Sequence, residues 1–244
     1  MNPSLLLSTT ARVLRQLRAD PRSLAMLLVV PPLLLTLFYF IYEGNPRLFS
    51  FVAVVMTVIL PMSLMFIVSS VTMQRERANG TLERLWTTRL HRGDLIGGYA
   101  LAFGLLAVVQ SVILVTVMVV FMDVQTEAPG WAITLIAGIT GVTGLSLGLL
   151  GSAFARSEFQ AVQLMPVLII PQILLCGLLI PRDGLPDVLR WISHAMPLSY
   201  AVDAVTAAAR SGVEAAVARD AATCLAFALG FLAVAATTMP RRTR

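Results

Sequence analysis

The chain has 244 residues, of which 57% are hydrophobic and only 13% are charged, and its mean hydropathy is +0.83. Soluble globular domains carry about 25% charged residues, so this composition excludes an ordinary soluble protein. The formal charge of +5 comes entirely from arginine, because the sequence contains no lysine. The distribution of these arginines along the chain indicates membrane topology rather than a nucleic-acid partner.

Six apolar stretches are long enough to cross about 30 Å of hydrocarbon at about 1.5 Å per residue. They occupy residues 24–42, 48–73, 95–122, 128–155, 159–181 and 221–240. Continuous apolar runs are incompatible with the alternating strands of an outer-membrane barrel. The sequence therefore predicts an all-α membrane protein with six transmembrane helices, organised as a single transmembrane domain over residues 1–244.

The arginines are distributed unequally between the two sides of such a six-span chain. The N-terminal segment, the second and fourth loops and the C-terminal tail carry 13 of the 18 arginines. Acidic residues show the opposite bias, with five on that side and eight on the other. Because cytoplasmic loops are enriched in basic residues, both termini are predicted to lie in the cytoplasm. No cleavable signal peptide is evident.

The first 22 residues are too few and too charged to cross a membrane. Apolar and small side chains recur there at helical spacing: Leu6, Thr10, Val13, Leu14 and Leu17. Arg12, Arg15 and Arg18 fall on another face. This pattern favours a helix over residues 3–19 that lies in the membrane interface, with its arginines near anionic headgroups. The alternative is a solvated basic leader.

A polar island, residues 74–89, separates the second span from the third. Within it Asn79-Gly80 predicts a turn, and Thr81 is a favourable N-cap for a short helix. Three residues share the apolar face of that helix: Leu82, Leu85 and Trp86. An apolar patch edged by charges suits a groove on a soluble partner. The alternative is a helix lying flat on the membrane, with Trp86 as an interfacial anchor.

The fourth span contains glycines at helix-packing spacing: Gly138, Gly141, Gly144, Gly148 and Gly151. The Gly144/Gly148 pair allows close helix approach, either within one chain or between two copies. Ser146 completes a G-x-S-x-G match, but that motif requires a strand–turn–helix elbow. His91 and His194 are predicted outside the hydrocarbon on opposite sides, so Ser146 is interpreted as a packing residue. An intramembrane serine hydrolase is the alternative.

Residues 182–220 form a long segment between the fifth and sixth spans. Two helical pieces are predicted in it, residues 186–196 and a second piece from Pro197 to about Arg210, ended by Gly212. Both are moderately apolar, which predicts an external helical hairpin that dips back toward the outer leaflet. Cys176 and Cys224 lie in apolar spans and are interpreted as small core residues.

The energy source is predicted to lie on another polypeptide. No ionisable residue lies near the middle of any predicted span, whereas ion-coupled carriers usually place charged groups there. The sequence contains no G-x-x-x-x-G-K-[ST] phosphate loop, so any ATP must bind a partner. These observations favour a translocator with a separate ATPase over an ATP-independent carrier, which is the second alternative.

Three stretches carry a resemblance to a known family. Residues 75–85 are similar to its E-x-x-x-G-T-L-E-x-L segment between spans two and three. Residues 171–181 are similar to its proline-flanked end of span five, with Cys176 in place of the usual serine, and residues 186–204 to its external P-L-S/T-Y region. In this order and spacing, the chain resembles the permease subunit of type-2 ABC transporters, the class that includes daunorubicin-resistance permeases.

The resemblance implies the membrane subunit of an ATP-driven exporter in a bacterial cytoplasmic membrane, with an apolar or amphipathic cargo such as a drug, lipid or glycolipid. It implies two copies of an ATPase subunit, which would hold ATP and Mg, and a second permease, identical or paralogous. This chain would carry no cofactor, metal or catalytic residue. By carry-over, residues 74–94 form a cytoplasmic coupling loop. The predicted ATPase contacts are Glu76, Gly80, Thr81, Leu82, Glu83, Leu85 and Trp86.

Overall fold

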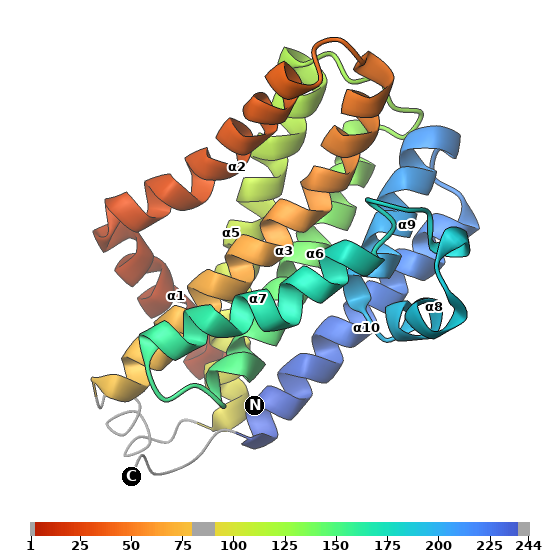
Figure 1. Cartoon of the computed structure of the whole chain (residues 1–244). Helices are drawn as coiled ribbons and strands as arrows, with labels where there is room; N and C mark the ends of the chain where they lie inside the picture. Colours follow the sequence, from red (N-terminus) through yellow and green to blue (C-terminus); the bar gives the residue numbers. More distant parts are fainter. Residues whose placement is uncertain (1–2, 80–90, 239–244) are drawn as a thin grey trace.

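Figure 1 shows the computed structural model of the chain, which describes residues 3–79 and 91–238. All regular elements within these two ranges are helices. In chain order they are α1 (Pro3–Ala19), α2 (Pro21–Ile41), α3 (Pro46–Ala78), α5 (Arg92–Thr116), the π-helical turn η1 (Val117–Phe121), α6 (Gly130–Ser152), α7 (Glu158–Leu175), the 3-10 turn η2 (Arg182–Gly184), α8 (Asp187–His194), α9 (Pro197–Ser211) and α10 (Ala215–Thr238).

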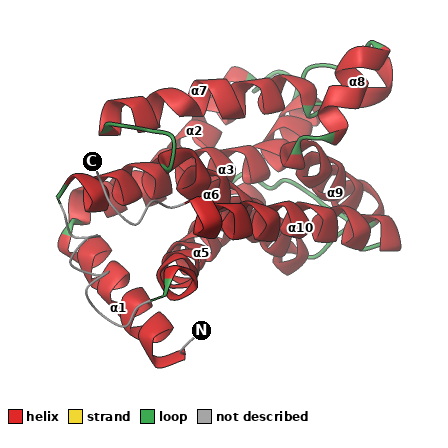
Figure 2. Cartoon of the chain, turned by 90° about the horizontal axis from the view of Figure 1, so that it is seen from below, coloured by secondary structure: helices red, strands yellow, loops and turns green. Residues whose placement is uncertain are grey.

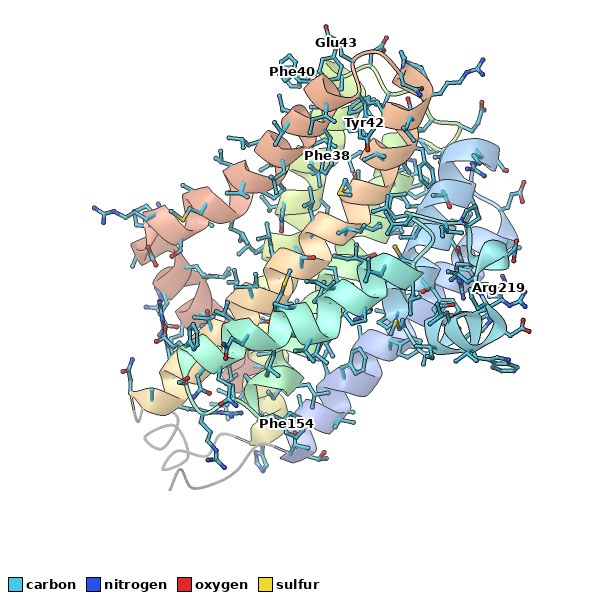
Figure 3. All side chains as sticks on the ribbon, viewed as in Figure 1. Phe38, Phe40, Tyr42, Glu43, Phe154 and Arg219 are labelled. Atoms are coloured by element: carbon cyan, nitrogen blue, oxygen red, sulfur yellow. The ribbon has the colours of Figure 1, made fainter. Side chains whose placement is uncertain are left out.

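Within residues 3–79 and 91–238, six helical stretches are long and apolar enough to cross a membrane. They are α2, α3, α5 continued by η1, α6, α7 and α10. The prediction of an all-α membrane protein with six spanning helices is therefore confirmed. Their arrangement has two ends: Figure 3 places Phe154 at one and Tyr42 and Glu43 at the other. We call these the loop end, where α3 ends and α5 begins, and the far end.

The second spanning helix is longer than its apolar run. α3 continues through the polar residues that follow Met73 and ends at Ala78, where the Asn79 N–H donates to the carbonyl of Arg75 at 3.0 Å. Gln, Arg, Glu and Ala are all good helix formers, so nothing in residues 74–78 stops the helix. Together with the start of α5 at Arg92, this shortens the predicted loop of residues 74–94 from both sides.

α6 lies at the centre of the helix bundle, among α3, α5 and α10 (Figure 2). Its glycines bring it against the backbone of α3. A Cβ added at Gly144 would lie 2.1 Å from the Met62 carbonyl oxygen, and one added at Gly148 would lie 2.4 Å from that of Phe66. The Gly144/Gly148 pair therefore packs two helices of the same chain against each other. Of the two alternatives left open by the sequence, this is close approach within one chain.

Ser146 lies in this packed region and is fully buried. Its hydroxyl donates to the Val142 carbonyl, 2.6 Å away in the same helix. Both histidines are described, and each contacts another residue: His91 lies 3.5 Å from an Asp94 carboxylate oxygen, and His194 contacts Arg182. Among the described residues Ser146 thus has no general base, and the hydrolase alternative loses its support.

α1 forms as predicted and packs on α5. Thr9 and Val13 are buried on its inner face, and a Cβ added at Gly98 of α5 would lie 2.6 Å from Thr9 Cβ. The helix ends at Ala19. The next residue, Asp20, caps α2 by accepting hydrogen bonds from Ser23, and these bonds lower the pKa of the Asp20 carboxyl. The placement of α1 in a membrane interface stays a prediction.

The segment of residues 182–220 that is predicted to be external contains α8 and α9, close to their predicted bounds, and the 3-10 turn η2. It is shorter than predicted, because α10 already begins at Ala215. Gly212 ends α9 with a φ of +80°, a conformation that favours glycine. Arg182 holds the segment together by pairing with Asp203 of α9 and donating to Ser193 Oγ of α8 at 3.2 Å. Burial raises the pKa of Asp203, and the Arg182 guanidinium opposes that rise. The dip toward a leaflet stays a prediction.

The α3–α6 contact predicts the outcome of a single substitution. Gly144→Val is expected to lower the stability by about 1–3 kcal/mol or more, because the new side chain meets backbone that cannot move aside. The measurement is thermal unfolding of the purified protein in detergent. Gly230→Val is the matched control, since Gly230 lies in α10 with nothing within 4 Å of an added Cβ. Equal effects of the two substitutions would contradict this account.

Candidate functional site

At the loop end, Glu76 joins three helices through one hydrogen-bonded network. It lies in the last turn of α3 and is only 6% exposed. Its carboxylate accepts from Gln16 Nε2 at 3.1 Å and from Arg12 Nη1 at 3.4 Å, both on α1. Arg12 Nη2 also donates to the Tyr99 hydroxyl of α5 at 3.1 Å. The network therefore connects the end of α3 to the start of α5 by way of α1.

The Arg12 guanidinium has a second interaction with α5. Its central carbon lies 5.9 Å from the centroid of the Tyr99 ring, within the range of a cation–π interaction. The Tyr99 side chain is itself fully buried. An arginine predicted to face headgroups thus lies between two other helices, whereas Arg15 and Arg18 are exposed.

Arg77, the next residue of α3, connects this helix to the end of α6. Its side chain is nearly buried, at 7% exposure, and Nη1 donates to the Ser152 carbonyl at 2.7 Å. A cation is favoured at the C-terminal end of a helix, where carbonyl groups lack intrahelical partners. Arg77 therefore fixes the end of α3 relative to the end of α6. Its Nε and Nη2 have no hydrogen-bond partner within residues 3–79 and 91–238.

Two weaker contacts complete the loop end. Arg75 Nε lies 3.0 Å from a Glu158 carboxylate oxygen in the first turn of α7, but both side chains are about half exposed. Exposed ion pairs of this kind contribute about 0–1 kcal/mol. The Asp94 side chain is fully buried and accepts from the His91 backbone N–H at 3.3 Å, which fixes the start of α5. Each helix end beside residues 80–90 is thus held by a polar side chain.

The predicted ATPase contacts fall into two groups. Glu76 is described, and its hydrogen-bond partners in the described part of the chain are on α1. The other six lie outside the described residues: Gly80, Thr81, Leu82, Glu83, Leu85 and Trp86. A direct contact of any of the seven with another subunit stays a prediction.

Sequence reasoning missed the partners of Glu76. Arg12 is one of three arginines with the same spacing on α1, and no local signal separates it from Arg15 and Arg18. Its contacts with Glu76 and Tyr99 are separated by 64 and 87 residues along the chain. The buried position of Arg77 was missed for the same reason, since its contact with α6 spans 75 residues.

Comparison with known proteins decides the family. The ABC-2 type transporter family matches residues 4–209, from α1 into α9. The chain belongs to the ABC-2 type transporter family. This confirms the resemblance found in the three sequence stretches and assigns the helix bundle to the membrane part of an ABC transporter.

The similar proteins carry transporter names. The chain is 27% identical over 164 residues to ABC transporter G family member 20 of Dictyostelium discoideum, which covers 66% of this chain and 22% of that protein. It is 27% identical over 152 residues to the probable multidrug ABC transporter permease YbhS of Escherichia coli strain K12, which covers 62% of this chain and 39% of that protein. The chain thus spans less than half the length of these relatives.

The Glu76 network predicts energetic coupling between α1 and α3. Arg12→Ala and Glu76→Ala are each expected to destabilise the protein, because each leaves a partly or fully buried charge without its partner. The double variant should lose less stability than the sum of the losses in the two single variants, by about 1 kcal/mol or more. A double-mutant cycle followed by thermal unfolding measures this coupling.

The exposed pair of Arg75 and Glu158 provides the matched control cycle, since it also joins α3 to a neighbouring helix. Its coupling energy is expected to stay below about 1 kcal/mol. Strict additivity in the cycle of Arg12 and Glu76 would show that the buried network does not hold the helices together.

Proposed function

We propose that this chain is the membrane subunit of an ATP-driven exporter, which moves an apolar or amphipathic molecule out of the cytoplasm or its inner leaflet. The observation that carries the proposal is the network of Arg12, Glu76 and Tyr99, which joins α1, α3 and α5 beside both ends of residues 80–90. Membership in the ABC-2 type transporter family supports a separate ATPase as the energy source. The multidrug name of the Escherichia coli relative supports a drug-like cargo.

In this proposal, two ATPase subunits dock on two permease subunits through residues 80–90. ATP binding changes the transport state only if docking is stronger in one state than in the other. A displacement of residues 80–90 reaches α3 at Ala78 and α5 at Arg92. α3 has 33 residues, which correspond to about 50 Å of helix, so it extends the displacement across the whole bundle.

The packing around α3 determines which helices move together. α6 is bound to α3 by the close contacts at Gly144 and Gly148 and by the bond from Arg77 to Ser152. α1 is bound to α3 through Glu76. A movement of the loop end is therefore expected to displace α1, α3 and α6 together, and α5 with them through the bond from Arg12 to Tyr99.

The proposal places the loop end in the cytoplasm and the far end outside. Asn79→Cys should therefore resist a membrane-impermeant thiol reagent in intact cells, whereas Asp187→Cys should be labelled. Both positions are exposed, and the native Cys176 and Cys224 are buried, so background labelling is expected to be low. Labelling at residue 79 with protection at residue 187 would reverse the orientation.

Residues 80–90 provide the test of coupling. Leu85→Ala is expected to weaken ATPase binding by about thirtyfold, because an apolar interface anchor contributes about 2 kcal/mol or more. Gly80→Val is expected to weaken it as well, because it adds bulk at the predicted turn. The ATPase should copurify poorly and transport should be lost, while the permease still inserts in the membrane.

Glu83→Ala is the matched control for the same segment. A charge at the rim of an interface contributes less to the binding free energy than an apolar anchor does. The effect of Glu83→Ala on ATPase binding should therefore be small and should diminish as the salt concentration rises. Normal ATPase binding and transport in both Leu85→Ala and Gly80→Val would leave the alternative of a helix that only lies on the membrane.

A further inference from the structure

Among the residues that the structure describes, a cavity at the far end is lined by two arginines and by no carboxylate. It has a volume of about 240 Å³ and lies between the first turn of α3, the α5–α6 connection and the last turn of α9. Its polar lining includes Arg47, Ser50, Gln125 and Arg210, and its apolar lining includes Phe51 and Val54. We call it the arginine cavity.

The charge of the surrounding segments makes this lining unusual. The segments predicted to be external carry eight acidic residues and five arginines. Three of these arginines form ion pairs: Arg182 with Asp203, Arg190 with Asp187, and Arg219 with Asp220. Arg47 and Arg210 have no ion-pair partner among the described residues. Acidic residues outnumber arginines in the segments predicted to be external. Arg47 and Arg210, the two arginines of these segments without an ion pair in the described residues, nevertheless line the same cavity.

A larger cavity adjoins the arginine cavity and has a different lining. It has a volume of about 580 Å³ and shares Phe51 and Arg210 with the arginine cavity. Leu48, Leu178 and Leu179 give it an apolar wall. It also contains Asp183 and Asp203, of which Asp203 is paired with Arg182. Arg182, Arg190 and His194 line it as well. The two cavities together therefore offer a cationic part next to a part that combines an apolar wall with side chains of both charges.

We propose that the arginine cavity binds the phosphate headgroup of an amphipathic molecule, whose apolar part lies along the leucines of the adjoining cavity. The planar guanidinium groups of Arg47 and Arg210 suit phosphate oxygens, which accept paired N–H donors. Arg47 lies in the first turn of α3, where the helix dipole also favours an anion. This inference rests on the proposed function, because it defines the cargo as an anionic amphiphile.

Binding to the purified full-length chain, without any ATPase and in a neutral detergent, tests the inference. The probes are a short-chain phosphatidic acid, a phosphatidylcholine with the same chains, and inorganic phosphate. Phosphatidic acid is expected to bind at least about tenfold more tightly than either of the others. Arg47→Gln and Arg210→Gln should each weaken its binding about tenfold, because each removes a charge-assisted contact.

Arg219→Gln is the matched control. It removes the same charge from the segment predicted to be external, at a residue that is exposed, as Arg47 and Arg210 also are. Arg219, labelled in Figure 3, pairs with Asp220 and is not among the residues that line either cavity. The affinity of the Arg219→Gln variant for phosphatidic acid should stay within about twofold of the affinity of the native protein. Thermal unfolding checks that all three variants are folded.

Three results would overturn the inference. An equal loss of affinity in Arg219→Gln would assign the binding to general surface charge. Binding of inorganic phosphate as tight as that of phosphatidic acid would show a site for free oxyanions, without the apolar part. Absence of binding by phosphatidic acid would show that the cavity does not take this headgroup. None of these results affects the coupling proposal, which is tested by ATPase copurification with the Leu85→Ala variant.

Discussion

The close contact between α3 and α6 determines how the remaining helices are placed. In a membrane, apolar surface gains little by leaving lipid for protein, so helices associate mainly through van der Waals packing and hydrogen bonds. Gly144 and Gly148 remove the side chains that would keep the two backbones apart. α5 and α10 then pack on other faces of α6, and α9 covers part of α3 and α6. The bundle is organised around this backbone contact.

In residues 3–79 and 91–238 the charged side chains lie toward the two ends of the bundle, and at each end an arginine contacts two other helices or segments. Arg12 contacts α3 and α5 at the loop end. Arg182 contacts α8 and α9 at the far end, through Ser193 and Asp203. Buried charges require partners, because removing an unpaired charge from water costs on the order of several kcal/mol of free energy per ion. These pairs therefore restrict which helices can separate and which must move together.

The two proposals concern opposite ends of the same long helix. α3 begins beside Arg47, which lines the arginine cavity, and ends beside Glu76, which is bound to α1. α3 is helical from Pro46 to Ala78, and Pro61 removes only one of its backbone hydrogen bonds, so the remaining bonds can transmit a displacement along the helix axis. Occupancy of a site at one end and docking at the other would then bias the same helix. Such a bias is reciprocal between two sites.

The sequence by itself determined the six spanning helices, the approximate bounds of α8 and α9, and the family. These features depend on local properties: apolar run length, the proline at residue 197, the glycine at residue 212, and motifs within short stretches. Only the tertiary structure decided that Gly144 packs inside the chain, that Arg12 pairs with Glu76, and that Arg47 and Arg210 line one cavity. Each of these contacts joins residues more than 60 positions apart, and a periodic pattern specifies a helix face without specifying which other helix covers it.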